Sequence, residues 1–211
     1  MPNPQSRSFV PTRIYLIRHG ESTWNAQRRW QGVADAPLSD AGRAEATLLA
    51  DALHTVPLRA VYCSPLRRAV DTAAVVAAVH RLDVIPVADL REIAFGVWES
   101  LLATEVEQRF GALLKEWWDR PDQVQIPGAE PLEAARARVA AAIHEIVARH
   151  EDGQVAVVAH GGVNKLLVLT LLDAPLSSYW RMRQDNACVN IVEFDGDRGR
   201  VLVLNDTTHL R

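Results

Sequence analysis

Two histidine–glycine pairs in this chain each follow a short apolar run that has the character of a buried strand. Arg18-His19-Gly20 comes directly after Arg13–Ile17, and His160-Gly161-Gly162 comes directly after Val155–Ala159. A histidine at the end of a strand is held rigidly, and the glycine behind it lets a ligand or another backbone segment approach closely. One such histidine is commonly structural. Two of them in one sheet favour a functional site.

An arginine adds positive charge to the same region. After the apolar run Ala60–Cys63, Ser64-Pro65 has the pattern of a helix N-cap followed by proline at the first helical position, so Arg68 falls in the first turn. Arg67 and Arg68 differ by about 100° around that helix, and we expect Arg68 to face the site and Arg67 the solvent. A planar guanidinium grips phosphate oxygens in bidentate fashion, which suits Arg18 and Arg68. The constellation therefore indicates phosphate chemistry.

The first motif extends into a longer signature. The run from Leu16 to Asn25, LIRHGESTWN, resembles the signature of the histidine phosphatase superfamily, which includes cofactor-dependent phosphoglycerate mutases. Shorter blocks resemble the same family, in family order and across nearly the whole chain: Gln31-Gly32, Leu38-Ser39 with Gly42, Ser64 to Ala69, Leu90-Arg91-Glu92 with Gly96 and Trp98-Glu99, His160-Gly161, and Asn205-Asp206 with His209-Leu210.

The resemblance implies a role for each matching residue. His19 would be the nucleophile that becomes a phosphohistidine, and Glu92 would donate a proton to the leaving oxygen. The phosphate pocket would be formed by Arg18, Arg68 and His160. Substrate binding would fall to Ser22, Asn25, Gln31, Gly32 and Gly161. The resemblance also implies a reaction without a metal or other cofactor, and a three-layer α/β/α sandwich with a variable cap.

Elementary chemistry supports these roles independently. Phosphoryl transfer needs positive charge around the equatorial oxygens and in-line placement of nucleophile and leaving group. His19 must be neutral at its attacking nitrogen, and neighbouring arginines oppose its protonation. We expect its other ring nitrogen to donate to a backbone carbonyl, which would fix the tautomer. Glu92 must instead hold a proton, and a dry site beside a phosphate dianion favours that; the same carboxylate can later activate water.

The elements that position these residues alternate along the chain. Strands are expected over Arg13–Ile17, Ala60–Cys63, Val84–Val87, Val155–Ala159, Val189–Phe194 and Val201–Leu204, the last two as a hairpin. Four helices are expected. The first follows a Ser39 cap and has apolar residues at helical spacing, Ala41, Ala44, Leu48 and Ala52, and the second follows Ser64 and has one apolar face, Leu66, Val70, Ala73 and Val76. The third begins at Pro131 and is expected to bury Leu132, Ala135, Val139, Ile143 and Ile146, and the fourth covers Leu166–Leu172. This alternation predicts a mainly parallel mixed sheet covered on both faces, with the site beyond the carboxyl ends of its strands.

One segment interrupts the alternation. Between Ile93 and Pro127 the pattern is irregular and places Trp98, Trp117 and Trp118 in a polar setting. We interpret residues 93–127 as a mostly helical cap inserted into a single domain that spans residues 1–211. Trp117 and Trp118 are expected to pack within the cap, where either can also line the substrate entrance.

Composition excludes several classes of protein. A formal net charge of −3 over 211 residues argues against a broad basic surface for nucleic acid. No apolar run reaches the roughly 20 residues of a membrane span, and Met1–Pro11 lacks the apolar core of a secretory signal, so a cytoplasmic location is expected. Cys63 and Cys188 are expected to be buried free thiols. The sequence is compatible with a homodimer through an exposed sheet edge.

Three functions remain open on the sequence. A phosphomonoesterase acting on a small phosphorylated metabolite is favoured, because the segment from Lys115 to Gly128 is shorter than the arginine- and tyrosine-rich cap of the mutases. The alternatives are a phosphoglycerate mutase-type phosphoryl transfer and an inactive protein that binds phosphorylated ligands. Many relatives carry a Gly-Gly-Glu-Ser turn where this chain has Gly128-Ala129-Glu130-Pro131, so we leave Glu130 outside the catalytic set. The sequence does not identify the substrate.

Overall fold

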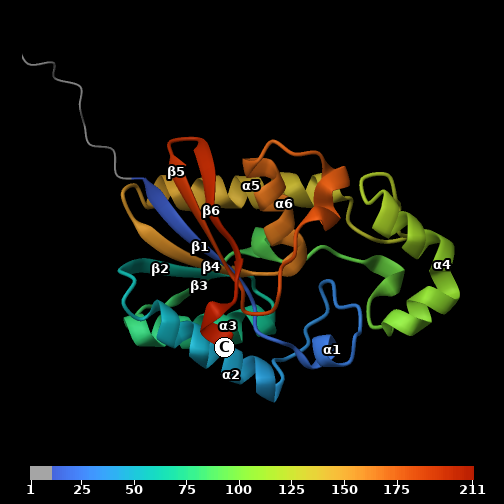
Figure 1. Ribbon diagram of the computed structural model, residues 1–211, viewed down its shortest axis with the longest axis horizontal. Helices are drawn as coiled ribbons and strands as arrows, with labels where there is room; N and C mark the ends of the chain where they lie inside the picture. Colours follow the sequence, from blue (N-terminus) through green and yellow to red (C-terminus); the bar gives the residue numbers. More distant parts are fainter. Residues whose placement is uncertain (1–10) are drawn as a thin grey trace, which may run out of the picture.

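Six strands form one mixed sheet in the order β3-β2-β4-β1-β5-β6 (Figure 1). The computed structural model describes residues 11–211, so the expectation for the segment that precedes them, Met1–Val10, lies outside it. The strands are β1 (Thr12–Arg18), β2 (Leu58–Cys63), β3 (Val84–Pro86), β4 (Gln154–Ala159), β5 (Val189–Asp195) and β6 (Arg198–Asp206). The first four in sheet order are parallel, β5 runs antiparallel to β1, and β6 pairs antiparallel with β5 as a hairpin, which confirms the predicted mixed sheet.

Helices cover both faces of this sheet. On one face lie α2 (Asp40–Leu53) and α3 (Arg67–His80), and on the other lie α5 (Leu132–Arg149) and α6 (Gly161–Leu171) (Figure 1). The remaining helical segments are α1 (Thr23–Ala26), η1 (Ala88–Leu90), η2 (Gly96–Trp98), α4 (Ala103–Asp119), η3 (Leu176–Arg181) and η4 (Thr208–Leu210). The central strands β1 and β4 carry continuous apolar runs, 14–17 and 155–159, because both of their faces are buried there. The predicted three-layer α/β/α sandwich is confirmed.

The face of α2 predicted from the sequence is wrong. Ser39 does cap the helix, since its hydroxyl accepts a hydrogen bond from the Gly42 amide at 3.0 Å. The buried side of the helix, however, carries Ala46, Leu49 and Leu53. Apolar side chains occur on both sides of this helix, so periodicity alone does not identify the packed one. The predicted stripe is exposed: Ala41, Ala44, Leu48 and Ala52.

The start of α3 also differs from the prediction. The helix begins at Arg67 with Leu66 as its N-cap, two residues later than Ser64-Pro65 implies. Ser64 is fully buried, and its hydroxyl oxygen accepts from the Leu66 amide at 3.2 Å, so it shapes the turn before the helix. Arg68 nevertheless lies in the first turn, as expected.

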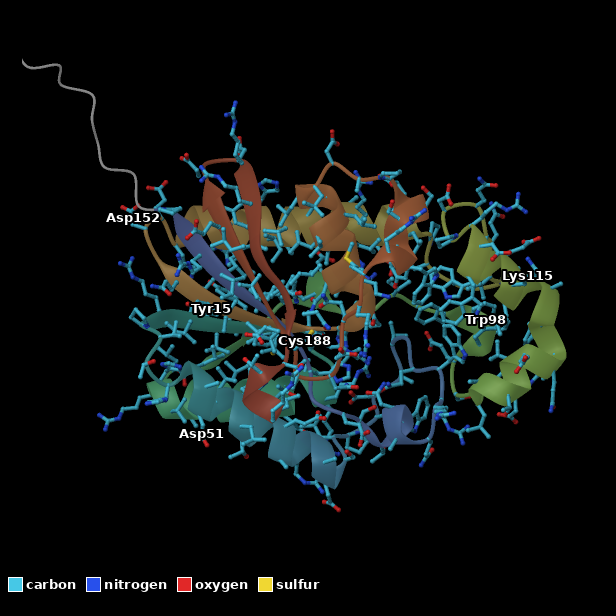
Figure 2. All side chains as sticks on the ribbon, in the orientation of Figure 1. Tyr15, Asp51, Trp98, Lys115, Asp152 and Cys188 are labelled. Atoms are coloured by element: carbon cyan, nitrogen blue, oxygen red, sulfur yellow. The ribbon has the colours of Figure 1, made fainter. Side chains whose placement is uncertain are left out.

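An aromatic cluster joins α4 to the main body. Trp98 and Trp117 are buried, and their rings meet edge to face with centroids 6.5 Å apart. Figure 2 places Trp98 beside α4, at the end of the molecule away from the β5–β6 hairpin. Trp30, Phe95, Tyr179 and Trp180 belong to the same cluster, and the exposed Trp118 borders it, with its ring centroid 4.2 Å from that of Trp180. The segment 93–127 therefore contributes α4 and part of a continuous core, and its assignment as a cap stays a prediction.

Both cysteines are buried and free, as predicted. Cys63 ends β2, and Cys188 lies just before β5, near the centre of the view in Figure 2. Burial raises the pKa of the Cys63 thiol to about 12 and that of Cys188 to about 11. Across residues 11–211, no helix combines the length and apolar character that crossing a membrane requires.

The neighbouring tryptophans of α4 give a matched test of this packing. Trp117 is 2% exposed and Trp118 is 48% exposed. We expect Trp117→Ala to lower the free energy of unfolding by about 3–5 kcal/mol because it leaves a cavity in the core, and Trp118→Ala to lower it by less than about 1 kcal/mol. Urea unfolding measures both, and equal losses would show that the aromatic cluster is not part of the core.

Candidate active site

His19 lies at the carboxyl end of β1 with both ring nitrogens engaged. Its Nδ1 is 2.6 Å from the carbonyl oxygen of Gly20, and its Nε2 is 3.2 Å from Nε of Arg68. Because a carbonyl only accepts hydrogen bonds, Nδ1 carries the proton and Nε2 presents its lone pair. The tautomer expected from the sequence is therefore the one that this geometry imposes.

The surroundings of His19 keep its ring neutral. Burial lowers the pKa of His19 well below its usual value, and the positive charges of Arg68 and Arg18 lower it further. A neutral imidazole with a free lone pair is nucleophilic, whereas an imidazolium is not. The arginines thus keep the neighbouring histidine deprotonated, and they bring positive charge to this end of the sheet.

Arg68 reaches this point from the first turn of α3 and is only 1% exposed. Besides His19, it donates from Nη1 to the carbonyl of Ala34 at 2.7 Å and from Nη2 to that of Gly32 at 2.9 Å. Burial lowers its pKa to about 10, so the guanidinium stays charged at neutral pH. Two of its five N–H groups remain for an anionic ligand. Arg67 is exposed and pairs with Asp71, as predicted.

His160 enters the same site from the end of β4. Its ring is fully buried, and its centroid lies 5.1 Å from that of His19 at an interplanar angle of 64°. Its Nε2 is 2.7 Å from the hydroxyl of Ser64, and its Nδ1 has no partner within residues 11–211. Burial and the charge of Arg68 lower the pKa of His160 well below its usual value. Ser64 had been assigned only a capping role, although it follows a strand just as the two histidines do.

Arg18 completes the cationic group. Its Nη1 donates to the carbonyl of Gln184 at 2.5 Å, while its buried Nε has no partner in the described part of the chain. Gly161 lies against this guanidinium. Three strand ends that are distant in sequence thus bring together Arg18, His19, Ser64 and His160.

Ser22, Asn25 and Gln31 bond mainly to one another. The Ser22 hydroxyl donates to Oε1 of Gln31 at 2.7 Å, and the Ser22 amide donates to Oδ1 of Asn25 at 3.1 Å. Since these bonds engage the side-chain oxygens, the NH2 groups of Asn25 and Gln31 are turned toward other partners. Ser22 itself is fully buried. It therefore orients the two amides rather than reaching a ligand.

Gly32 supports Arg68 through its backbone. Its φ of +54° belongs to the left-handed region, and a Cβ atom there would lie 2.1 Å from Oε1 of Glu99. Glycine adopts this conformation without strain, and its carbonyl is one of the acceptors that hold the Arg68 guanidinium.

The Glu92 side chain is held by the N-terminus of α6, the helix that begins directly after His160. Its carboxylate accepts from the backbone amides of Gly162 at 3.0 Å, Val163 at 3.2 Å and Ile93 at 2.9 Å. A Cβ atom at Gly162 would lie 2.4 Å from Oε1 of Glu92, so the close approach requires glycine. These contacts fix the position of the carboxylate to which the sequence analysis assigned the role of proton donor.

A cleft of about 400 Å³ unites most of these residues. Seven of the ten residues assigned from the sequence line it: Arg18, His19, Asn25, Gln31, Gly32, Arg68 and Glu92. The other three, Ser22, His160 and Gly161, are not among its lining residues. The sequence analysis missed five further lining residues, Arg28, Arg29, Trp30, Phe95 and Ala103, whereas Trp118 had been proposed for the entrance. Arg28 through Trp30 directly precede Gln31-Gly32, a proximity that could have singled them out.

A larger cavity of about 600 Å³ lies along the segment from Pro121 to Glu133. It contains none of the residues assigned to catalysis, and we place the reaction in the smaller cleft. Among residues 11–211, no three histidine, cysteine or acidic side chains gather in a group able to hold a metal ion.

Comparisons with known proteins identify the family of this chain. Residues 14–207 match the model of the histidine phosphatase superfamily, branch 1. The chain belongs to this superfamily. Phosphoserine phosphatase 1 of Hydrogenobacter thermophilus is 34% identical over 198 residues, which cover 94% of each chain. Phosphoglycerate mutase-like protein 4 of Arabidopsis thaliana is 34% identical over 202 residues, covering 93% of this chain and 86% of the relative.

Solved structures show the same fold. Bacillus stearothermophilus YhfR superposes with a TM-score of 0.91 at 35% identity, over 95% of this chain and all of the other. A mycobacterial glucosyl-3-phosphoglycerate phosphatase in complex with VO3 superposes with a TM-score of 0.86 at 28% identity, over 92% of this chain and 99% of the other.

The neutral histidines give the protein a defined pH dependence. The unfolded chain takes up protons on histidine below about pH 6.5, whereas buried His160 does not, so stability falls as pH falls through that value, by about 1.4 kcal/mol per pH unit per histidine. We expect His160→Gln to remove one such contribution between about pH 6.5 and 5. Urea unfolding across that range measures the slope. The control is the same substitution at an exposed histidine, His144→Gln. If His160→Gln leaves the slope of stability against pH unchanged, a neutral buried His160 is contradicted.

Proposed function

We propose that this protein is a metal-independent phosphomonoesterase that hydrolyses a small phosphorylated metabolite through a phosphohistidine on His19. The observation that carries the proposal is the His19 ring itself. Its Nδ1 proton is committed to the Gly20 carbonyl, and its Nε2 lone pair faces Arg68 in the cleft that Glu92 also lines. A nucleophile, a cationic pocket and a proton donor therefore share one cavity.

In the first step the lone pair of His19 Nε2 attacks phosphorus, and the bond from phosphorus to the ester oxygen breaks. A phosphate oxygen takes over the Arg68 N–H that His19 accepts in the free enzyme. Arg18 and Arg68 balance the charge on the equatorial oxygens. The fully buried ring of His160 contacts the same oxygens. Glu92 gives its proton to the departing oxygen, which leaves as an alcohol.

In the second step water attacks the phosphohistidine. Glu92, now a carboxylate, takes a proton from this water as the oxygen bonds to phosphorus, and the phosphorus–nitrogen bond breaks. Phosphate leaves, and His19 regains its neutral form with Nδ1 still bonded to Gly20. The same carboxylate thus acts first as acid and then as base.

Relatives support hydrolysis over the alternatives. Phosphoserine, 2-carboxy-D-arabinitol 1-phosphate and glucosyl-3-phosphoglycerate phosphatases are named among the similar proteins. The presence of both histidines and both pocket arginines argues against an inactive phospho-ligand binder. The leaving group would lie against the cleft residues outside the phosphate pocket, including Arg28 and Trp118. A cytoplasmic enzyme fits the two free thiols, and a homodimer stays a prediction.

The first test is phosphate release from p-nitrophenyl phosphate in excess EDTA. We expect turnover to survive chelation and to fall by at least about 10³-fold in His19→Ala, because the nitrogen proposed to attack phosphorus is then gone. Acid-quenched protein should carry phosphate on the intact enzyme and not on the variant. Turnover lost on chelation, or retained in His19→Ala, would refute metal-free histidine catalysis.

The second test separates the roles of acid and nucleophile. We expect Glu92→Gln to lower kcat/KM for phenyl phosphate, a poor leaving group, by about 10²-fold or more, because the departing oxygen then lacks a proton donor. p-Nitrophenyl phosphate, whose anion leaves unaided, should lose less than about tenfold. Equal losses on the two esters would remove Glu92 from the role of general acid.

A further inference from the structure

A partly buried ion pair contacts the loop that carries Glu92. Arg138 projects from α5, and Glu130 precedes that helix; their side chains are 10% and 13% exposed. Nε and Nη2 of Arg138 each donate to a different carboxylate oxygen of Glu130, both at 2.7 Å. This is the planar two-point pairing that arginine makes and lysine does not.

The remaining N–H groups of Arg138 donate to backbone carbonyls of that loop. Nη1 donates to the carbonyls of Asp89 at 2.6 Å and Arg91 at 2.8 Å, and Nη2 donates to the carbonyl of Glu92 at 3.2 Å. Together with the pairing to Glu130, these bonds occupy all five N–H groups of the side chain. Three of the five therefore hold the segment that ends in the proposed proton donor.

Glu130 adds its own contacts to the same segment. Its amide donates to the carbonyl of Ala94 at 2.9 Å, and its carboxylate accepts from Arg91 at 3.3 Å. Burial opposes the charged form of Glu130, but the hydrogen bonds and charge of Arg138 outweigh it, so the pKa of Glu130 is lowered. The pair is thus ionised at neutral pH and grips residues 89–94 from one side.

On the opposite side, the Glu92 side chain is held by the amides of Gly162 and Val163. The carboxylate end of this residue is fixed by α6 and its backbone end by α5. We propose that Arg138, set by Glu130, is a positioning residue that fixes the Glu92 carboxylate for proton transfer to the leaving group. This inference rests on the acid role proposed for Glu92.

A purely structural ion pair would behave differently. Its loss would lower stability and would slow turnover of every ester alike. Loss of a positioning pair slows those reactions that need the proton of Glu92 more than the others, because a small displacement of a catalytic group is costly.

The test compares wild type, Arg138→Lys and Arg136→Lys on p-nitrophenyl phosphate and phenyl phosphate, below the unfolding temperature of each protein. Lysine keeps the charge but has three donors at one point instead of a planar fork. We expect Arg138→Lys to lower kcat/KM for phenyl phosphate by about tenfold or more and for p-nitrophenyl phosphate by less than about threefold. Arg136, which lies on the same helix outside the pair, serves as the matched control and should show no change.

Two further measurements separate this inference from the proposed function. In the Glu92→Gln background, Arg138→Lys should add less than about threefold on phenyl phosphate, because the group it positions is already gone. Amide hydrogen exchange of residues 89–94 should be faster in Arg138→Lys than in wild type. Unchanged exchange, equal losses on both esters, or fully additive effects would each overturn the positioning role.

Glu92→Gln on its own judges the acid role. If that variant shows no leaving-group dependence, the role proposed for Glu92 fails, and the exchange experiment still decides whether Arg138 holds the loop. Should Arg138→Lys not fold, Glu130→Gln provides the second variant. It leaves the arginine in place and weakens its orientation, so the same selectivity is expected with a smaller loss on phenyl phosphate.

Discussion

The hydrogen bond between His19 and the carbonyl of the next residue constrains the whole site. It commits the proton to Nδ1, and a neutral ring beside two arginines is possible only because burial and those same charges lower the pKa. The carbonyl belongs to the backbone that leaves β1, so strand geometry sets the direction of the lone pair. Whatever positions the substrate must bring phosphorus to that lone pair, since the ring has no second choice of tautomer.

The guanidinium groups of Arg18 and Arg68 lose contact with water in the site, and hydrogen bonds to backbone carbonyls offset that cost. Arg68 donates to the carbonyls of Gly32 and Ala34, and Arg18 donates to that of Gln184. Carbonyl dipoles stabilise the guanidinium groups without neutralising them, so the positive charge stays available to an anion. A carboxylate in the same place would have consumed that charge. The described residues that line the cleft include one acidic side chain, Glu92. Its Oε1 accepts from two backbone amides and its Oε2 from one, so Oε2 keeps a site for a proton.

Much of this arrangement could be predicted from the sequence because the candidate catalytic residues directly follow apolar strands. His19 and His160 follow apolar runs, and parallel strands present their carboxyl ends at one edge, so their meeting follows from topology. The supporting contacts could not be predicted. Arg138 acts through carbonyl oxygens, which every residue possesses, and its sequence distance from Glu92 has no periodic meaning. The buried face of α2 was missed for a related reason: alanine and leucine occur on both of its sides, and tertiary packing decides between them.

The short turn between β4 and α6 contributes to two parts of the site. In the proposed reaction His160 contacts the phosphate, and the amides of Gly162 and Val163 hold the Glu92 carboxylate that would protonate the leaving oxygen. Acid and anion pocket therefore share one rigid frame, while α4 contributes Ala103 and Trp118 to the cleft from outside it. Sequence drift along α4 can thus alter which alcohol the enzyme accepts while the geometry of bond cleavage is inherited unchanged. In this architecture, selectivity and chemistry are free to evolve at different rates.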